Sequence, residues 1–476
     1  MTCVLGMVVS REREIRNFVK TKYYKIIGEF GNDDGTFKAE WKVNQNSKMF
    51  ESTKLYNESG FKKEEDAKAL IHKLKAMEPQ EAELVSIERK KETRYAPLLF
   101  NLAELQNECS KRFKISPDET LKITQELYEK KLVTYPRTDA RVLSTAVAKE
   151  IYKNIGGLRS YGKLSEYAQE VLNGTVWKGI AKTRYVNDKQ ITDHYAIVPT
   201  GQGLSALRSL NPVSEQIYEV IARRFLAIFY PAAEYQKVQL VTEVRGERFF
   251  SGFKVLLNEG YLKVLPQGTA DAAKKKADAE NEETEDVRVD AKFLELLKHL
   301  KRGDSVEVSG FHIKEGETSP PKRYNSGSMI LAMENAGQLI EDEELRAQIK
   351  GSGIGTSATR AEILKKLVNN KYIALNKKTQ IITPTLLGEM IFDVVRASIY
   401  GLLNPELTAS WEKGLTQMAE GTITEDYYMQ KLEKYITDKT QAVLAADYRR
   451  ALRPCFDASA RFYKTQKSEK KETKKK

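Results

Sequence analysis

The sequence predicts an α+β fold that is divided among several domains. Three observations support this prediction. The chain has 476 residues, which is enough for about three domains of ordinary size. Apolar and polar residues alternate from 235 to 266, as in strands, whereas the chain after residue 319 has apolar positions at helical spacing. Hydrophobic residues make up 41% and charged residues 30%, so the apolar content suffices for real cores.

The first hundred residues mix both kinds of element. Residues 5–20 have the apolar spacing of a helix with charged residues between. The stretches KYYKIIGEF (22–30) and TFKAEWKV (36–43), joined through GNDDG, predict a β-hairpin with a glycine-containing turn. Residues 61–88 predict a helix followed by a strand, and a helical region begins at residue 96.

The strongest helix signal lies at residues 116–131, SPDETLKITQELYEKK. Ser116 is in position to cap the first turn, Pro117 fits the first helical position, and Glu119 can complete a capping box. This helix leads directly into LVTYPRTD, so Tyr135 should lie on a short extended segment just after the helix. Further helical patterns continue to about residue 230.

Two later segments lack apolar anchors. Residues 268–288 are small and charged, which predicts a flexible insertion. Residues 461–476 are expected to form a disordered basic tail, since Lys464 to Lys476 contains seven Lys and two Glu, a net +5 of the chain's +12. A basic surplus suits a polyanion such as nucleic acid, although lysine-rich solvated surfaces also produce it.

Several classes of protein are disfavoured by the composition. No run of about 18 apolar residues or signal peptide is present, so we expect a cytoplasmic protein without membrane contact. The cysteines at 3, 109 and 455 are distant from one another and form no C-x-x-C pair, which argues against disulfides and a cysteine zinc site.

The sequence around Tyr135 has the residue types of a phosphate-attacking site. A tyrosine phenol has a pKa near 10 and is a weak nucleophile, but a cation two residues away, Arg137, favours the phenolate and can bind the phosphate. Pro136 fixes the backbone between them, and Thr138 and Asp139 can orient the arginine. The alternative is a tyrosine packed beside a proline turn, and spacing alone favours this alternative.

A second candidate cluster is VNDKQITDHYAIVPTG, residues 186–201. His194 is one of four histidines, follows Asp193, and can bind or protonate a phosphate oxygen or a leaving group. Its alternative is a structural histidine that caps a loop.

A third cluster is the glycine-rich GSGIGTSATR. Gly353 and Gly355 precede a helix expected to begin near Ser357, with Thr359 and Arg360 in its first turn. Glycine-rich amides at a helix start can bind phosphate, although the glycines can equally serve the loop alone. The spacing matches neither a P-loop nor a dinucleotide fingerprint, so no ATP site is expected.

The fourth cluster is PPKRYNSGSMILAMENAG, residues 320–337. Lys322, Arg323 and Tyr324 are the types that line a single-strand groove, where cations follow the backbone and aromatics stack on bases.

Taken together and in this order, the motifs resemble the type IA DNA topoisomerases, particularly their topoisomerase III branch. LVTYPRTDARVLS resembles the family's active-site tyrosine motif. TDHYAIVPT, PPKRYNSGSMILAMENAG, GIGTSATRAEIL, TPTLLGEMI and NPELTASWEKGLTQMAEG resemble its later blocks. The resemblance extends from about residue 5 to about 450.

The resemblance implies catalytic roles for three residues. Tyr135 would attack a single-stranded phosphodiester to form a 5′-phosphotyrosine, Arg137 would stabilise the phosphate, and His194 would assist at the phosphate or the leaving 3′ oxygen. DNA contacts would come from Thr138, Asp139, Asp193, Lys322, Arg323, Tyr324, Gly353, Gly355, Thr359 and Arg360.

The resemblance also implies an architecture. The family forms a toroid, for which residues 1–29 with 319–460 would supply a helical base. Residues 30–94 with 229–318 would form a β-rich arch, and residues 95–228 would form the domain that carries the tyrosine.

One family feature has no counterpart in these residues. Members begin with an acidic Toprim domain whose D-x-D-x-E run holds Mg²⁺, and neither this run nor the family's zinc ribbon is found in the sequence. The implied Mg²⁺ would therefore need ligands from elsewhere, such as a separately encoded Toprim-containing partner.

Two classes of function remain open. One is a topoisomerase core that cleaves and rejoins single-stranded DNA, and the other is a truncated, inactive module that only binds single-stranded DNA. A tyrosine recombinase or relaxase is disfavoured, because neither an Arg-His-x-x-Arg cluster nor a histidine metal triplet is found.

Overall fold

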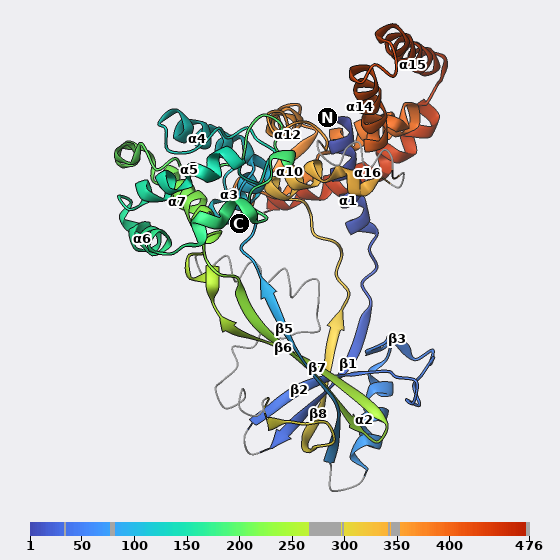
Figure 1. The fold of residues 1–476 in the computed structure, drawn as a ribbon. Coiled ribbons are helices and arrows are strands. Elements are labelled where there is room, and N and C mark those ends of the chain that lie inside the picture. The colour runs from blue at the N-terminus through green and yellow to red at the C-terminus, as the bar shows by residue number, and fades with distance from the viewer. Residues whose placement is uncertain are drawn as a thin grey trace. The chain divides into compact units, whose positions relative to one another are not determined.

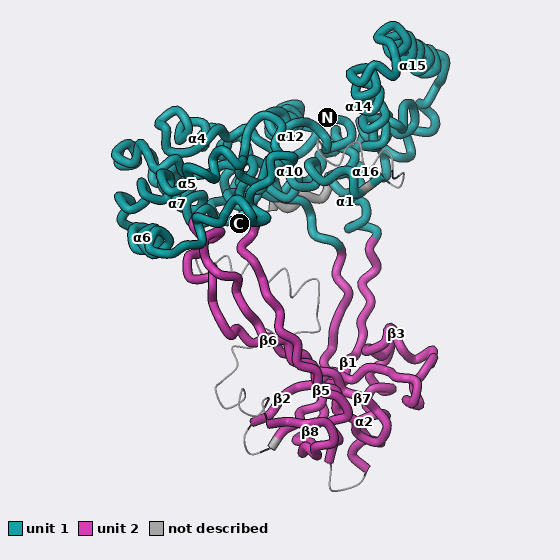
Figure 2. The backbone as a smooth tube through the Cα atoms, viewed as in Figure 1, with its two compact units in different colours: residues 1–17, 98–225, 321–476 teal, residues 18–97, 226–320 magenta. Residues whose placement is uncertain are grey.

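The chain folds into two compact units, each assembled from separate stretches of sequence (Figure 2). Unit 1 comprises residues 1–17, 98–225 and 321–476, and unit 2 comprises residues 18–97 and 226–320. The computed structural model describes residues 1–32, 35–76, 81–265, 297, 299–340, 343 and 353–472. The insertion predicted at 268–288 and the last four residues of the predicted tail lie outside the described residues.

Unit 2 is built on one antiparallel eight-stranded sheet in the order β2-β7-β6-β5-β8-β1-β4-β3 (Figure 1). Strand β2 also pairs with β1, so six of the strands close into a ring, which removes most exposed strand edges. The elements of unit 2 are β1 (Lys22–Asn32), β2 (Gly35–Lys42), β3 (Leu55–Asn57), β4 (Gly60–Phe61), α2 (Glu64–Lys75), β5 (Glu81–Arg94), β6 (Ala233–Val244), β7 (Glu247–Asn258), a 3-10 helix (Gly260–Lys263) and β8 (Ser305–Glu317).

Aromatic side chains fill the core of unit 2. Strand β2 alternates between buried and more exposed positions, and its inward residues include Phe37 and Trp41. The ring of Trp41 stacks on Phe61 with centroids 5.0 Å apart, and its indole N–H donates to Glu247 at 2.8 Å. Burying the indole therefore leaves no polar atom of that ring without a partner.

Unit 1 is mainly helical, with one small hairpin (Figure 1). Its helices and strands are α1 (Thr2–Asn17), α3 (Leu102–Phe113), α4 (Pro117–Glu129), α5 (Thr145–Leu158), α6 (Ser165–Asn173), α7 (Pro212–Ala227), α10 (Ser326–Glu334), α12 (Arg360–Asn369), β9 (Ile373–Leu375), β10 (Ile382–Pro384), α13 (Leu386–Ser398), α14 (Pro405–Ala419), α15 (Glu425–Ala445) and α16 (Arg449–Glu472). Short 3-10 helices lie at Gly162–Leu164, Val176–Lys182, Asp188–Gln190, Leu204–Ser209, Ala336–Leu339 and Tyr400–Leu403.

One apolar cluster joins the first helix of unit 1 to segments more than 300 residues later. It contains Val4, Leu5, Val8 and Val9 from α1 together with side chains from α10, α12, the β9–β10 hairpin and α13. The spacing of these four valine and leucine positions gives α1 one buried face. Residues 1–17 are therefore an integral part of the helical unit.

Three of the predicted segments lie in unit 2. The hairpin is confirmed as β1 and β2, with Phe30 opposite Phe37, and the helix then strand within 61–88 are α2 and β5. The strands predicted over 235–266 are confirmed as β6 and β7 up to Asn258, whereas Gly260–Lys263 form a 3-10 helix and residue 266 lies outside the described residues. The two-unit division does not test the proposed three domains, which stay a prediction.

One domain bound and one element boundary differ from expectation. Strand β1 begins at Lys22, as the hairpin predicted, but its pairing places it in the sheet of unit 2, whereas the resemblance assigned residues 1–29 to the helical base. Helix α16 extends through residues 461–472, where we expected a disordered tail. Within the described part of the chain, no helix combines the length and hydropathy needed to cross a membrane.

Candidate active site

The segment that carries Tyr135 leaves α4 through a fixed turn. Ser116 caps the start of α4 by accepting from the Glu119 amide at 3.2 Å, as the sequence predicted. At the other end, Lys131 adopts a left-handed backbone with φ of 61°, and the Leu132 amide donates back to the Leu127 carbonyl at 2.9 Å. The helix end therefore sets the direction in which the chain approaches Tyr135.

Beyond the turn, residues 133–138 run alongside residues 194–199 in the opposite direction. The Thr134 amide donates to the Val198 carbonyl at 3.0 Å, and the Thr138 hydroxyl donates to the His194 carbonyl at 2.8 Å. Thr138 is buried. These bonds bring together the tyrosine and histidine motifs, which lie about 60 residues apart in the sequence.

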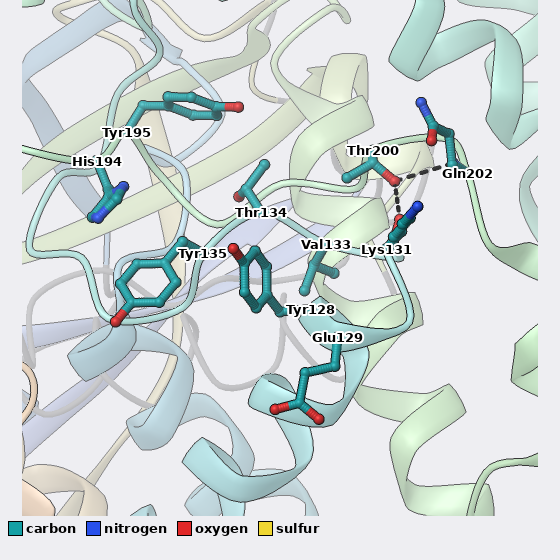
Figure 3. Close-up of a pocket in the computed structure, with 10 residues that line it drawn as sticks. All are labelled: Tyr128, Glu129, Lys131, Val133, Thr134, Tyr135, His194, Tyr195, Thr200 and Gln202. Carbon is teal, nitrogen blue, oxygen red and sulfur yellow. Dashed lines mark hydrogen bonds between the residues drawn. The ribbon is translucent and has the colours of Figure 1, made fainter.

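The rings of Tyr135 and His194 are in contact, with centroids 4.4 Å apart (Figure 3). Tyr135 is half-buried, while His194, Asp193 and Arg137 are exposed. Within the described residues, Arg137 forms no hydrogen bond or ion pair. Its guanidinium is thus available for an anion two residues from the phenol.

Asp139 and Arg360, both predicted to bind DNA, are bonded to each other. Arg360 Nη1 donates to Asp139 Oδ1 at 2.8 Å and lies 3.8 Å from Glu334 Oε1. Asn101 Nδ2 connects Asp139 to Glu334, because it donates to Glu334 Oε1 at 2.7 Å and to the Asp139 carbonyl at 3.2 Å. Burial raises the pKa of the Glu334 carboxyl, despite the opposing effect of Arg360.

Arg360 and Asp139 differ in how far their side chains are exposed to solvent. The Arg360 side chain is 1% exposed, whereas that of Asp139 is 37% exposed. The buried Arg360 guanidinium is placed to support the segment that carries Tyr135 and Asp139, and a DNA-binding role for Arg360 stays a prediction. The contact connects the third sequence cluster with the first.

The glycine-rich loop before α12 is shaped by two left-handed glycines. Gly353 has φ of 64° and Gly355 has φ of 72°, and a Cβ at Gly353 would come within 2.4 Å of the Met333 carbonyl oxygen. The helix begins at Arg360, not near Ser357 as predicted, with Thr359 as its N-cap residue. Thr359 is exposed, but its hydroxyl accepts from the Thr356 amide at 2.9 Å.

The fourth cluster lies against α1. Arg323 donates to both carboxylate oxygens of Glu12, at 2.7 and 2.9 Å, and this pairing lowers the pKa of Glu12. The Arg11 guanidinium lies over the Tyr324 ring at 4.5 Å and donates to its hydroxyl at 3.2 Å. Lys322 is exposed. A DNA-binding role for these three residues stays a prediction.

The carboxylates near Tyr135 do not fit a Mg²⁺ site. Asp139 and Glu334 both face Arg360, whose positive charge opposes a metal ion there. Among the described residues, no group of three or more His, Cys, Asp or Glu side chains is arranged to hold a metal. No step of the reaction can be assigned to a metal held by these residues.

Sequence reasoning missed three residues of this site: Tyr128, Asn101 and Glu334. The Tyr128 ring meets the Tyr135 ring edge-on, with centroids 5.4 Å apart at 78° (Figure 3). Its position seven residues before Tyr135 was the available signal, because it places Tyr128 in the last turn of the capped helix. No motif near Asn101 or Glu334 indicated a role, because these two residues contact each other although they lie far apart in the sequence.

Comparison with known proteins gives a consistent result over most of the chain. A family model described as DNA topoisomerase matches residues 1–430. The chain is 33% identical to DNA topoisomerase 3 of Bacillus subtilis over 439 residues, which is 91% of this chain and 54% of that protein. It is 31% identical to DNA topoisomerase 3 of Bacillus licheniformis, with the same coverage of both chains. The chain thus spans about half the length of the curated relatives it matches.

A solved structure supports the fold independently. The structure of full-length topoisomerase I from Thermotoga maritima resembles this chain with a TM-score of 0.61 and 22% identity. The match covers 92% of this chain and 62% of that one.

Proposed function

This chain belongs to the DNA topoisomerase family, in its type IA, topoisomerase III-like branch, and from this premise we propose that it cleaves and rejoins single-stranded DNA through Tyr135. The observation that carries the proposal is the contact between the Tyr135 and His194 rings at 4.4 Å, with the exposed Arg137 two residues from the phenol. A nucleophile, a polar imidazole and a phosphate-binding cation are the groups that a phosphoryl transfer needs.

The proposed reaction exchanges one phosphodiester bond for another. The Tyr135 oxygen attacks phosphorus, the phenol loses its proton, and the bond from phosphorus to the 3′ oxygen breaks. The 3′ oxygen leaves as a hydroxyl after taking up a proton, and the 5′ phosphate stays on the tyrosine. Rejoining reverses these steps, so the bond energy is conserved without ATP.

Arg137 and His194 act on the charge that develops in this exchange. Arg137 donates to the non-bridging phosphate oxygens, where negative charge increases in the transition state. His194 donates to the phosphate or to the leaving 3′ oxygen. Asp139 and Arg360 contribute by holding the loop that carries both Tyr135 and Arg137.

The Mg²⁺ requirement that the family implies has to be met by other ligands, because Asp139 and Glu334 face Arg360. We propose that an acidic, Toprim-containing polypeptide completes the cleavage site and that the two act in the cytoplasm on single-stranded DNA. We retain the three-domain division as part of this proposal: residues 95–228 carry the nucleophile, residues 1–29 with 319–460 form the helical base, and residues 30–94 with 229–318 form the β-rich part. The one exception is strand β1, which begins at Lys22 and pairs within the sheet of the β-rich part.

The test is covalent capture of labelled DNA. Single-stranded oligonucleotide is incubated with the chain, a Toprim-containing fragment and Mg²⁺, and the products are separated on a denaturing gel. A 3′-end label should migrate with the protein, since the 5′ phosphate is the one retained, whereas a 5′-end label should not. Tyr135→Phe should abolish the labelled protein band while leaving DNA binding intact.

The alternative results are informative. An adduct that survives Tyr135→Phe would exclude Tyr135 as the nucleophile. If DNA is bound but no adduct forms with any fragment or metal, the chain is a single-strand binding module instead. Arg137→Ala is the companion variant, and we expect it to reduce adduct formation by roughly 100-fold or more, as for the loss of an oxyanion-stabilising group.

A further inference from the structure

A cavity of about 600 Å³ lies beside the nucleophile in unit 1. Its walls come from the last turn of α4, from the segment that carries Tyr135, and from residues 194–202 (Figure 3). Tyr135 and His194 form one end, so the cavity shares a wall with the proposed cleavage site. A nucleoside bound in it would adjoin the attacked phosphate.

The cavity is preformed by contacts between its walls. The Thr200 hydroxyl donates to the Lys131 carbonyl and accepts from the Gln202 amide at 3.1 Å (Figure 3). These bonds fasten the end of α4 to the segment that follows His194. A ligand would therefore find the walls already in place, which reduces the ordering cost of binding.

The side chains of the cavity suit a flat, uncharged heterocycle. Tyr128 leaves 40% of its surface exposed at the end of α4, and Tyr195 lines the same cavity. Burial raises the pKa of Tyr195, so this ring stays a neutral phenol at pH 7. The charged groups Glu129 and Lys131 have opposite signs and offset each other. Aromatic faces with balanced charge favour a nucleobase over a phosphate.

The proposed reaction indicates which nucleoside of the cleaved strand would place its base in the cavity. After cleavage, the strand attached to Tyr135 begins with the nucleoside on the 3′ side of the broken bond. That nucleoside is tethered to Tyr135, which lines the cavity, whereas the other strand end leaves with its 3′ hydroxyl and has no covalent bond to the protein. We propose that the cavity is a base-binding subsite for this first nucleoside, with Tyr128 as its stacking residue; the assignment to this nucleoside rests on the proposed function.

Glu129 gives the subsite a preference among bases. Its carboxylate accepts from Gln125 Nε2 at 3.3 Å through Oε1. The second oxygen can accept from the exocyclic amino group of cytosine, adenine or guanine, which thymine lacks. Cleavage sites should therefore disfavour thymine immediately after the broken bond, and Glu129→Gln should weaken that bias.

The test uses a fluorescent base whose emission falls on stacking. A trinucleotide with a 5′ phosphate and 2-aminopurine as its first base is titrated with the full chain. Tyr128→Leu should raise the dissociation constant by roughly 5- to 100-fold, the usual range for one lost base–aromatic stack, whereas Tyr128→Phe should change it less than about twofold. Matched probes carry 2-aminopurine at the third position, or are the free 2-aminopurine nucleoside monophosphate.

Each outcome bears on the subsite. Equal affinity of wild type and a folded Tyr128→Leu, judged by circular dichroism, would overturn it, as would Tyr128-dependent quenching only at the third position. Binding of the free monophosphate as tight as that of the trinucleotide would identify a free-nucleotide site and would overturn the assignment to the DNA strand. If quenching depends on Tyr128 while no covalent adduct forms, the cleavage proposal fails and the base-binding subsite stands. If an adduct forms but quenching does not depend on Tyr128, the cleavage proposal stands and the subsite is overturned.

Discussion

At the scale of single residues, the ion pair between Asp139 and Arg360 joins a partly exposed carboxylate to a buried guanidinium. If Asp139 is replaced by Asn, the buried Arg360 guanidinium loses the carboxylate that it contacts at 2.8 Å and keeps Glu334 at 3.8 Å. We expect Asp139→Asn to lower the free energy of unfolding by about 2–4 kcal/mol, because weakening the ion pair of a buried charge is strongly destabilising. Urea denaturation measures this directly. Adduct formation should fall as well, since the loop that holds Arg137 loses its attachment.

Asp193→Asn is the matched control for this prediction. Asp193 is exposed and lies in the segment that pairs with the tyrosine segment. Its replacement should alter the unfolding free energy by less than about 0.5 kcal/mol. Equal effects of the two substitutions would show that the Asp139–Arg360 contact does not support the loop.

At the scale of elements, the last helix is attached to the first by a buried ionic network. Glu389 on α13 is 1% exposed and accepts from Arg16 at 2.7 Å and from the Tyr463 hydroxyl at 2.6 Å. Arg13 adds a two-pronged contact to Asp393 at 2.7 and 2.8 Å. Phe462 also packs on the Arg16 guanidinium, at 4.3 Å. These contacts explain why α16 continues into residues that composition alone predicted to be disordered.

Removing the central carboxylate should loosen this attachment. Glu389→Gln leaves two arginines without their shared partner, and we expect a loss of about 3 kcal/mol in the free energy of unfolding of unit 1. Faster protease cleavage within α16 should accompany it. Glu14→Gln, which removes an exposed pair with Arg11, is the control and should cost less than about 1 kcal/mol. A small effect at Glu389 would mean that the other contacts of α16, such as those of Arg13 with Ser459 and Arg16 with Phe462, suffice to hold it.

Prediction from sequence succeeded where the signal is local and failed where it is tertiary. Helix α4 follows from Ser116 and Pro117, and its start was predicted correctly because capping involves neighbouring residues. The position of His194 beside Tyr135 could be inferred only from resemblance, since it depends on pairing between distant segments. Arg360 was assigned to DNA because a helix start attracts anions, whereas its bond to Asp139 joins residues 221 positions apart and has no local signature.

At the scale of the whole molecule, net charge and surface exposure together determine how the chain should bind a polyanion. The chain carries +12, but cations such as Arg360 and Arg323 are engaged by carboxylates, so only part of this charge is available to DNA. Each phosphate neutralised on a single strand contributes about 0.7 to the slope of log affinity against log salt. The slope therefore counts the cations that reach the strand.

We expect the affinity for single-stranded DNA to fall steeply with salt, and the slope to separate the two kinds of arginine. Arg137→Ala should reduce the slope by about 0.7, because Arg137 is exposed and its proposed partner is a phosphate. Arg360→Met should leave the slope unchanged even if affinity falls, because its partner is Asp139. Fluorescence anisotropy of a labelled oligonucleotide from 50 to 300 mM KCl, about the range over which such effects are large, gives both values. Binding that does not respond to salt would contradict phosphate contacts by exposed cations such as Arg137. An equal change of slope in both variants would contradict the distinction between Arg137 and Arg360.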